Sequence, residues 1–198
     1  MSRINVNKIT GATGTASGAP ITLSGDTATL SGTGVTFPAG HTIQTKYYSS
    51  QETNALSATY TVRWFTDITL VSGNSKILII HSFNWYTANG GGWGMKVRRN
   101  KDTSYSDGTT DGTIGTSVWD LNVNNSTGPL SAYSSAAGEV YSTATFNIED
   151  DLSASFDAGD TANYGFYYAR YSSTTSVIPG GASPDNGWFN TTIMEISK

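Results

Sequence analysis

The segment "SATYTVRWFTDITLVSGNSKILIIHSFNWY", residues 57–86, contains two stretches that predict neighbouring β-strands. In the first, Tyr60, Val62 and Trp64 alternate with polar residues, which is the period of two expected for a strand with one buried face. The second contains the run "KILIIHSF" (76–83), which is apolar over four consecutive positions and predicts a strand buried on both sides. In an oligomer, the second buried side is predicted to be a subunit contact.

Six further segments combine β-branched and aromatic residues and are bounded by Gly, Asn, Asp and Pro. No segment of ten or more residues has helical periodicity, and Leu, Glu, Lys and Gln are scarce. Eight strands separated by turn-rich loops predict an all-β chain whose residues 42–198 form a jelly-roll-like antiparallel β-sandwich. The predicted strands are 42–48, 57–70, 76–86, 93–99, 117–123, 139–149, 163–171 and 188–196.

Residues 14–41 contain a seven-residue repeat, GTASGAP, ITLSGDT, ATLSGTG and VTFPAGH, with threonine second in every unit. Apolar residues lie two apart in the last three units, so they fall on one face of a strand rather than on a helical seam. The Ser-Gly pairs that follow have turn chemistry. Each unit is predicted to be a short strand and a turn, and the apolar positions are Ile21, Leu23, Ala28, Leu30, Val35 and Phe37.

Such a unit buries too little apolar surface to offset the entropy of ordering its backbone unless neighbouring units supply contacts and hydrogen bonds. These neighbours are successive turns of the same chain or equivalent turns of other chains. We predict that residues 1–41 form a repetitive β stalk in which three chains wrap around one axis. The alternative is a Gly/Ser/Thr linker without regular structure.

Composition narrows the functional class of the 198-residue chain. The net charge of −4 argues against a nucleic-acid coat, and the basic run "KVRRNK" (96–101) predicts a solvated strand end or hairpin, with phosphate or glycan contact as the alternative. Without cysteine there is no disulfide or thiolate zinc site. The longest apolar run, "ILII" (77–80), is too short to insert in a membrane. The start "MSRINVNKITG" lacks the apolar stretch of a secretory signal. No residue pattern in the chain predicts a bound cofactor.

Four short motifs, in this order, resemble a class of virion structural proteins of marine tailed phages: "INVNKITGATGT" (4–15), "GVTFPAGHTIQTKYY" (34–48), "SGNSKILII" (72–80) and "TTIMEISK" (191–198). The resemblance touches both ends and the middle of the chain. It implies a homotrimeric tail fibre or virion appendage, with the N-terminal segment attached to other virion proteins and the β domain distal. It implies no catalytic residues, and residues 85–138 match nothing in that class.

The histidines, serines and acidic residues that could take part in catalysis or metal binding are better explained by structural roles. His41 follows a Pro-Ala-Gly turn and His81 lies in an apolar strand, and no serine has the surroundings of a catalytic elbow. The acids at 149–151 predict a turn, and the spacing of Asp102, Asp107 and Asp111 does not fit a calcium loop. We therefore expect no catalytic residues and no metal site.

Aromatic residues flanked by Gly, Asn and Asp are the composition of carbohydrate-stacking sites. Trp93 lies between glycines in "NGGGWG" and is predicted to be an exposed ring. Further candidates for glycan or receptor contact are Trp85, Tyr86 and Trp188, and for Trp85 and Trp188 a place in the core is the alternative. Four tyrosines crowd residues 164–171, so some are expected to meet solvent or a partner subunit.

These features predict a non-enzymatic, homotrimeric virion protein without membrane insertion or nucleic-acid binding, whose stalk attaches to the particle and whose sandwich contacts the host surface. Multivalency would convert weak glycan contacts into useful avidity. The alternatives are a capsid decoration or fibre protein on the head, and a soluble carbohydrate-binding module whose repeat is only a linker. A polysaccharide depolymerase is a more distant third.

Overall fold

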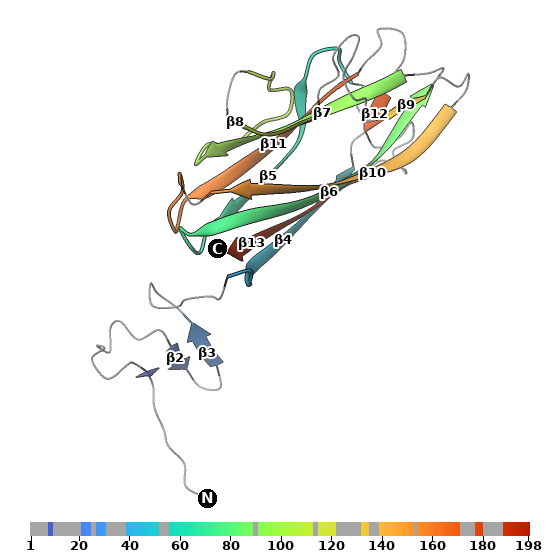
Figure 1. The fold of residues 1–198 in the computed structure, drawn as a ribbon. Coiled ribbons are helices and arrows are strands. Elements are labelled where there is room, and N and C mark those ends of the chain that lie inside the picture. Colours follow the sequence, from blue (N-terminus) through green and yellow to red (C-terminus); the bar gives the residue numbers. More distant parts are fainter. Residues whose placement is uncertain are drawn as a thin grey trace, which may run out of the picture. The chain divides into compact units, whose positions relative to one another are not determined.

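The computed structural model divides the chain into two compact units, Met1–Ala39 and Gly40–Lys198 (Figure 1). Among the described residues, no helix is long and apolar enough to cross a membrane. The described residues are 8–9, 21–24, 27–30, 39–51, 56–88, 91–112, 115–121, 132–134, 139–152, 154–170, 177–179 and 188–198.

The first unit contains an antiparallel sheet in the order β1-β2-β3. Its strands are β1 (Lys8–Ile9), β2 (Ile21–Ser24) and β3 (Thr27–Leu30). The register places apolar residues opposite apolar ones and hydroxyl residues opposite hydroxyl residues, because Ile21 pairs with Leu30 and Thr22 with Thr29. Two consecutive repeat units therefore pair as strands within one chain. Val35 and Phe37, the remaining predicted stalk positions, lie outside the described residues.

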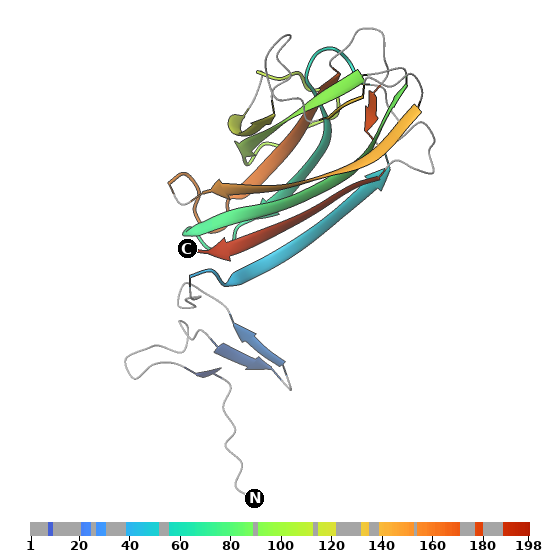
Figure 2. The same cartoon turned by 45° about the vertical axis from the view of Figure 1, so that its right-hand side comes forward.

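The second unit consists of two antiparallel sheets that pack as a sandwich (Figure 2). One sheet has the order β10-β6-β13-β4, with β12 also paired to β6; the other has the order β5-β11-β7-β8, with β9 also paired to β7. The strands are β4 (Thr42–Gln51), β5 (Thr61–Thr69), β6 (Ser75–Ala88), β7 (Gly91–Lys101), β8 (Thr116–Leu121), β9 (Ala132–Ser134), β10 (Glu139–Asp151), β11 (Thr161–Arg170), β12 (Val177–Pro179) and β13 (Trp188–Ser197).

The strand order is that of a jelly roll. Apart from the short β9 and β12, the sequence contains eight long strands, and successive strands alternate between the sheets except at β7 and β8. The first and last of these strands, β4 and β13, are neighbours in one sheet, while β5 and β11 are neighbours in the other. These pairings form two Greek keys. The predicted all-β jelly-roll-like sandwich is confirmed, and each of the eight predicted strands overlaps an observed one.

The core lies between the inner faces of the two sheets and is rich in aromatic residues. Alternate residues of β13 are buried, as the period of two requires. In β6 the same alternation buries Ile77, Ile79 and Phe83 and leaves Leu78 and Ile80 partly exposed on the outer face. The predicted two-sided burial of this run is therefore incomplete in a single chain. The largest fully buried side chains are Trp93, Tyr164, Tyr167, Tyr168, Phe83, Phe166 and Phe189.

A β-bulge in β5 reverses the side-chain alternation that the sequence predicted for this strand. Trp64 pairs with Phe166 and Val62 with Tyr167, so Arg63 is an extra residue in β5. As a result, Trp64 packs against the main core, while Val62 and Tyr60 belong to a second cluster. The prediction that Tyr60, Val62 and Trp64 share one face was wrong for Trp64, because the bulge reverses the alternation.

The second cluster buries one of the four tyrosines of residues 164–171, some of which were expected to meet solvent or a partner. Tyr167 is on the outer face of β11, where the ring of Tyr105, from the segment after β7, contacts it edge-to-face with ring centroids 6.0 Å apart. Tyr105 lies directly over Gly165, because a Cβ built there would be only 2.8 Å from its ring. Tyr164 and Tyr168 face the core instead. All three described tyrosines of β11 are thus buried by their own chain.

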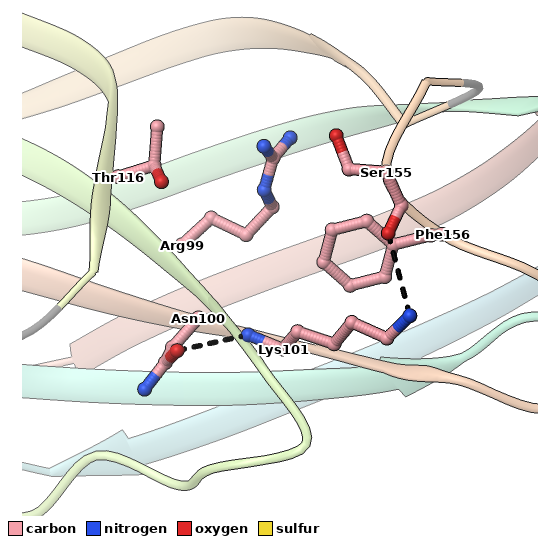
Figure 3. Close-up of a pocket in the computed structure, with 6 residues that line it drawn as sticks. All are labelled: Arg99, Asn100, Lys101, Thr116, Ser155 and Phe156. Carbon is pink, nitrogen blue, oxygen red and sulfur yellow. Dashed lines mark hydrogen bonds between the residues drawn. The ribbon is translucent and has the colours of Figure 1, made fainter.

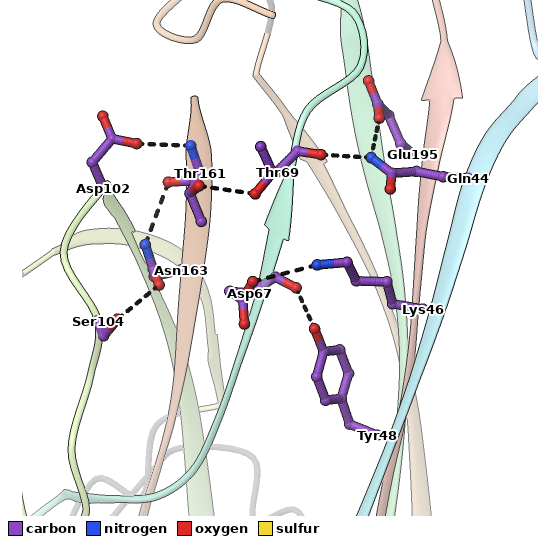
Figure 4. A network of polar contacts seen from close by, with 10 residues as sticks. All are labelled: Gln44, Lys46, Tyr48, Asp67, Thr69, Asp102, Ser104, Thr161, Asn163 and Glu195. Carbon is purple, nitrogen blue, oxygen red and sulfur yellow. Dashed lines mark hydrogen bonds and ion pairs between the residues drawn. The ribbon is translucent and has the colours of Figure 1, made fainter. Parts of the chain in front are cut away.

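Side chains join the two sheets along their β4 and β5 edges (Figure 4). Tyr48 donates a hydrogen bond to the carbonyl of Asp67 at 2.7 Å, and Lys46 forms an ion pair with the Asp67 carboxylate at 3.4 Å. Gln44 donates to the carbonyl of Thr69 at 2.6 Å. These inward-facing polar groups of β4 fix the outward direction of the residues between them.

Candidate functional site

The outer face of the β10-β6-β13-β4 sheet carries two exposed aromatic rings on adjacent strands. Trp188 at the start of β13 is 43% exposed, and Tyr47 on β4 is 65% exposed. The register pairs Trp188 with Gln51 and Thr192 with Tyr47, so both aromatic residues are on the same side of the sheet. Exposed aromatic rings on one flat face can cover the apolar surface of a ligand.

A polar side chain lies between the two rings. Asn190 is two residues after Trp188 on the same face of β13, and its Oδ1 accepts a hydrogen bond from the Tyr47 hydroxyl at 2.7 Å. The bond positions the phenol ring against the neighbouring strand. Among the residues that the structure describes, the Asn190 amide nitrogen has no hydrogen-bond partner, so its two N–H groups can donate to a ligand.

The described outer-face residues beside these rings are uncharged. Ser49 and Ser82 lie on either side of Asn190 in the neighbouring strands β4 and β6. Toward the other end of these strands, Lys76 pairs with Glu149 at 3.2 Å. We define the Tyr47–Trp188 face as the outer-face residues Tyr47, Ser49, Gln51, Ser82, Asn84, Trp188, Asn190 and Thr192.

Three of the four aromatic residues predicted to contact glycan are buried. Trp93 is only 1% exposed, and its ring packs edge-to-face against Phe83 with centroids 4.8 Å apart. The prediction that Trp93 is an exposed loop ring was wrong, because the glycines around it belong to strand β7 and the pleat directs Trp93 inward. Trp85 and Tyr86 are also buried, and for Trp85 this agrees with the core alternative. Trp188 alone of the four is exposed.

Sequence reasoning missed Tyr47 and Asn190. A signal for Tyr47 was present, because the doublet Tyr47-Tyr48 in a strand of period two must direct one ring outward. Which ring faces out depends on the packing of Tyr48 against Asp67 on the other sheet. Asn190 had no distinguishing signal, since its role depends on its cross-strand neighbour Tyr47.

His81 is fully buried at the centre of the sandwich. Its Nδ1 lies 2.7 Å from the Thr191 hydroxyl and its Nε2 lies 2.5 Å from the Tyr168 hydroxyl. Trp64 donates its indole N–H to the same Thr191 oxygen at 2.7 Å. Burial lowers the pKa of His81 to about 3, so the ring is neutral at physiological pH. No carboxylate is among these partners, and the arrangement does not form a Ser-His-Asp triad.

The basic run on β7 forms ion pairs within the chain. Lys96 and Arg98 contact the two carboxylate oxygens of Asp111 at 2.7 and 3.0 Å. Burial acts to raise the pKa of the Asp111 carboxyl, but hydrogen bonds from Arg98 and Lys96 outweigh it and the pKa lies below its usual value. Arg99 contacts Asp150 at 2.6 Å. These pairs neutralise much of the positive charge of the run.

A surface pocket of about 210 Å³ lies beside the end of β7 (Figure 3). Lys101 extends past the Phe156 ring, donates to the carbonyl of Ser155 at 3.4 Å and pairs with Asp160 at 2.5 Å. The pocket is smaller than typical ligand sites of roughly 300 Å³ or more. Its lining residues are Arg99, Asn100, Lys101, Thr116, Ser155 and Phe156.

Several of the described acidic residues form ion pairs or accept hydrogen bonds from the backbone. Glu149, Asp150 and Asp151 end strand β10 rather than forming the predicted turn, and each pairs with a different cation. Glu195 is fully buried and accepts hydrogen bonds from the backbone N–H groups of Val71 and Ser72. Within the described part of the chain, no cluster of three His, Cys, Asp or Glu residues could hold a metal ion.

No family model matches the sequence, and no curated protein matches it. Solved structures that match include infectious bursal disease virus strain Gx, at 12% identity and a TM-score of 0.35, covering 91% of this chain and 42% of that one. The VP2 subviral particle of the same virus matches at 12% identity and a TM-score of 0.20, covering 91% and 42%.

A further match is dimeric latent PorU from Porphyromonas gingivalis, at 12% identity and a TM-score of 0.28, covering 92% of this chain and 15% of that one. The chain thus spans less than half the length of each of these three structures. At these TM-scores the matches carry no argument about function.

Proposed function

We propose that the chain is a non-enzymatic structural protein of a tailed-phage virion, a homotrimeric fibre or appendage whose sandwich contacts the host surface. The proposal rests on the jelly-roll strand order, which recurs in viral capsid and lectin domains, in a chain that also has a separate small β unit built from repeats. The motifs resembling tailed-phage virion proteins add support. The N-terminal unit would attach to other virion proteins.

The described side chains favour a structural role over catalysis. The one buried histidine has hydroxyl partners, and Asp111 and Asp150 pair with cations. A glycosidase needs two carboxylates across a cleft, one of which keeps its proton at working pH. Because Asp111 has a lowered pKa and two cationic partners, it is unsuited to that acid role.

Labelling of intact particles with an antibody against the sandwich, viewed by electron microscopy, tests the proposal. Labelled tail tips or fibres are expected. Labelled head surfaces would favour the alternative of a capsid decoration or fibre protein. Particles without label, with the protein in the soluble fraction of the lysate, would overturn the virion proposal.

A soluble carbohydrate-binding module is the second candidate, and the exposed ring of Trp188 favours it. Light scattering of the full-length protein separates the two candidates. A trimer supports the stalked virion protein, while a monomer at micromolar concentration whose N-terminal unit is rapidly removed by protease supports the binding module.

A further inference from the structure

We propose that the Tyr47–Trp188 face binds a neutral polysaccharide, with the two rings stacking on sugar units and Asn190 donating to their hydroxyls. The inference deepens the proposed function, because it names the class of host-surface molecule, and it rests on that function for its biological role. The binding itself depends only on the outer face of β4 and β13.

Both aromatic rings are exposed to solvent, so a ligand can reach them. Aromatic side chains contribute large apolar areas when buried, and the core of this sandwich buries most of its aromatic residues. Trp188 and Tyr47 are exceptions on one face, and Figure 1 shows their strands β13 and β4 side by side. Because inward-facing neighbours of Tyr47 are held by β5, the ring cannot turn into the core without breaking those contacts.

The rings and the Asn190 amide are held in position before a ligand binds. The hydrogen bond from Tyr47 to Asn190 joins the phenol to the amide across the two strands. A sheet face supplies rigid positions, so less conformational entropy is lost on binding than for rings on a loop. Trp188 and Asn190 are two residues apart on one strand, a separation of about 7 Å. A ring and an amide at this spacing can engage neighbouring parts of one sugar chain.

Charge identifies the class of polysaccharide. The face between the rings has hydroxyl and amide side chains, and the charged pair Lys76 and Glu149 lies at the other end of the sheet. An acidic polymer or a nucleic acid would find no cation among the residues of the Tyr47–Trp188 face and would meet a chain of net charge −4. A neutral polymer suits this surface, because its hydroxyls can exchange hydrogen bonds with Ser49, Ser82 and Asn190 without desolvating a charge.

A second copy of the chain fits this face less well. The central part of a permanent subunit interface is apolar, whereas the cross-strand partners of Asn190 are Ser49 and Ser82, and the partly exposed Leu78 and Ile80 lie farther along β6. If another protein surface covered these hydroxyl groups without offering them hydrogen-bond partners, the buried hydroxyls would be unsatisfied.

Affinity electrophoresis of the full-length protein tests the inference, with native gels containing dextran, mannan, galactan or, as an acidic comparison, alginate. We expect at least one neutral polymer to retard the protein. Trp188→Ala should weaken the apparent affinity about tenfold, as expected for loss of a central aromatic contact, and Tyr47→Ala should weaken it in the same direction.

Phe65→Ala is the matched control, because Phe65 is 46% exposed on β5 of the other sheet. Its retardation should equal that of the unmodified protein. Thermal unfolding of each variant shows whether the fold is intact.

Three results would overturn the inference: no retardation by any neutral polymer, stronger retardation by alginate, or equal losses for Phe65→Ala and Trp188→Ala. A change from trimer to monomer in Trp188→Ala would assign the face to contacts between copies instead. If the antibody labels particles but no polymer binds, only this inference is contradicted. If a polymer binds but the antibody labels no particles, only the virion proposal is contradicted.

Discussion

His81 Nδ1 lies 2.7 Å from the Thr191 hydroxyl, which joins β6 to β13 by a side-chain hydrogen bond at the buried centre of the sandwich. The ring also stacks on Phe166 with centroids 4.3 Å apart. Either tautomer gives each ring nitrogen one hydrogen-bond partner. The neutral ring is therefore satisfied, whereas a protonated ring would be a buried charge without a counter-ion among the groups in contact with it.

Stability should fall as the pH is lowered through the ordinary range of histidine. His81 titrates near 6.5 when unfolded and at about 3 when folded, so the unfolded state binds the extra proton between these values. Unfolding free energy from urea titrations should drop by about 2 kcal/mol between pH 7 and pH 5. His81→Gln, which keeps an amide donor and acceptor, should lose most of this slope; an unchanged slope in the variant would contradict the assignment.

Glu195→Gln should destabilise the sandwich by about 2 to 3 kcal/mol. The carboxylate accepts from the backbone N–H groups of Val71 and Ser72 at 3.0 and 2.9 Å, and an amide NH₂ cannot accept one of these bonds. The control Glu149→Gln removes an exposed ion pair with Lys76 and should cost below about 1 kcal/mol. Equal losses in chemical denaturation would show that the buried contacts of Glu195 contribute no more than an exposed pair.

Gly165→Ala should destabilise the protein by about 1 to 3 kcal/mol, because the new Cβ would lie 2.8 Å from the Tyr105 ring. In a Tyr105→Ala background the same change should cost little, since the ring that it meets is gone. A double-mutant cycle by thermal unfolding measures this coupling. Additive losses would mean that the backbone of β11, rather than Tyr105, requires the glycine.

Truncating two tryptophans should have very different effects on stability. Trp93→Ala removes a ring that packs against Phe83 and Trp85 in the core and should cost about 3 to 5 kcal/mol. Trp188→Ala affects a ring that is 43% exposed and should cost below about 1 kcal/mol. Comparable melting temperatures for the two variants would contradict their placement.

The repeat unit should support assembly through its apolar positions. Leu23→Asp introduces a charge at a position opposite Ala28, and it should convert the proposed trimer to smaller species in light scattering. Thr22→Asp, at a position opposite Thr29, should leave the mass unchanged because the threonine positions form the alternate set. The sandwich should melt at the same temperature in both variants, since it is a separate compact unit. A monomeric unmodified chain would contradict the stalk prediction.

The sequence by itself determined that the chain is all-β, where its eight long strands lie and that two sheets form a sandwich. Period-two alternation and turn residues are local signals, so they specify strands such as β13 without knowledge of their partners. The apolar run 76–83 also predicted a buried strand, and Ile77 and Ile79 of this run are in the core.

Only the tertiary structure decided which aromatic residues face solvent. Trp93 lies among glycines that are typical of a loop, yet pairing with β11 and β9 extends β7 through them and directs the ring inward. Tyr167 faces away from the main core but is covered by Tyr105. The partnership of Tyr47 with Asn190 joins residues 143 positions apart. Strand pairing and covering loops depend on contacts between distant segments, and the local pattern of one strand contains no information about them.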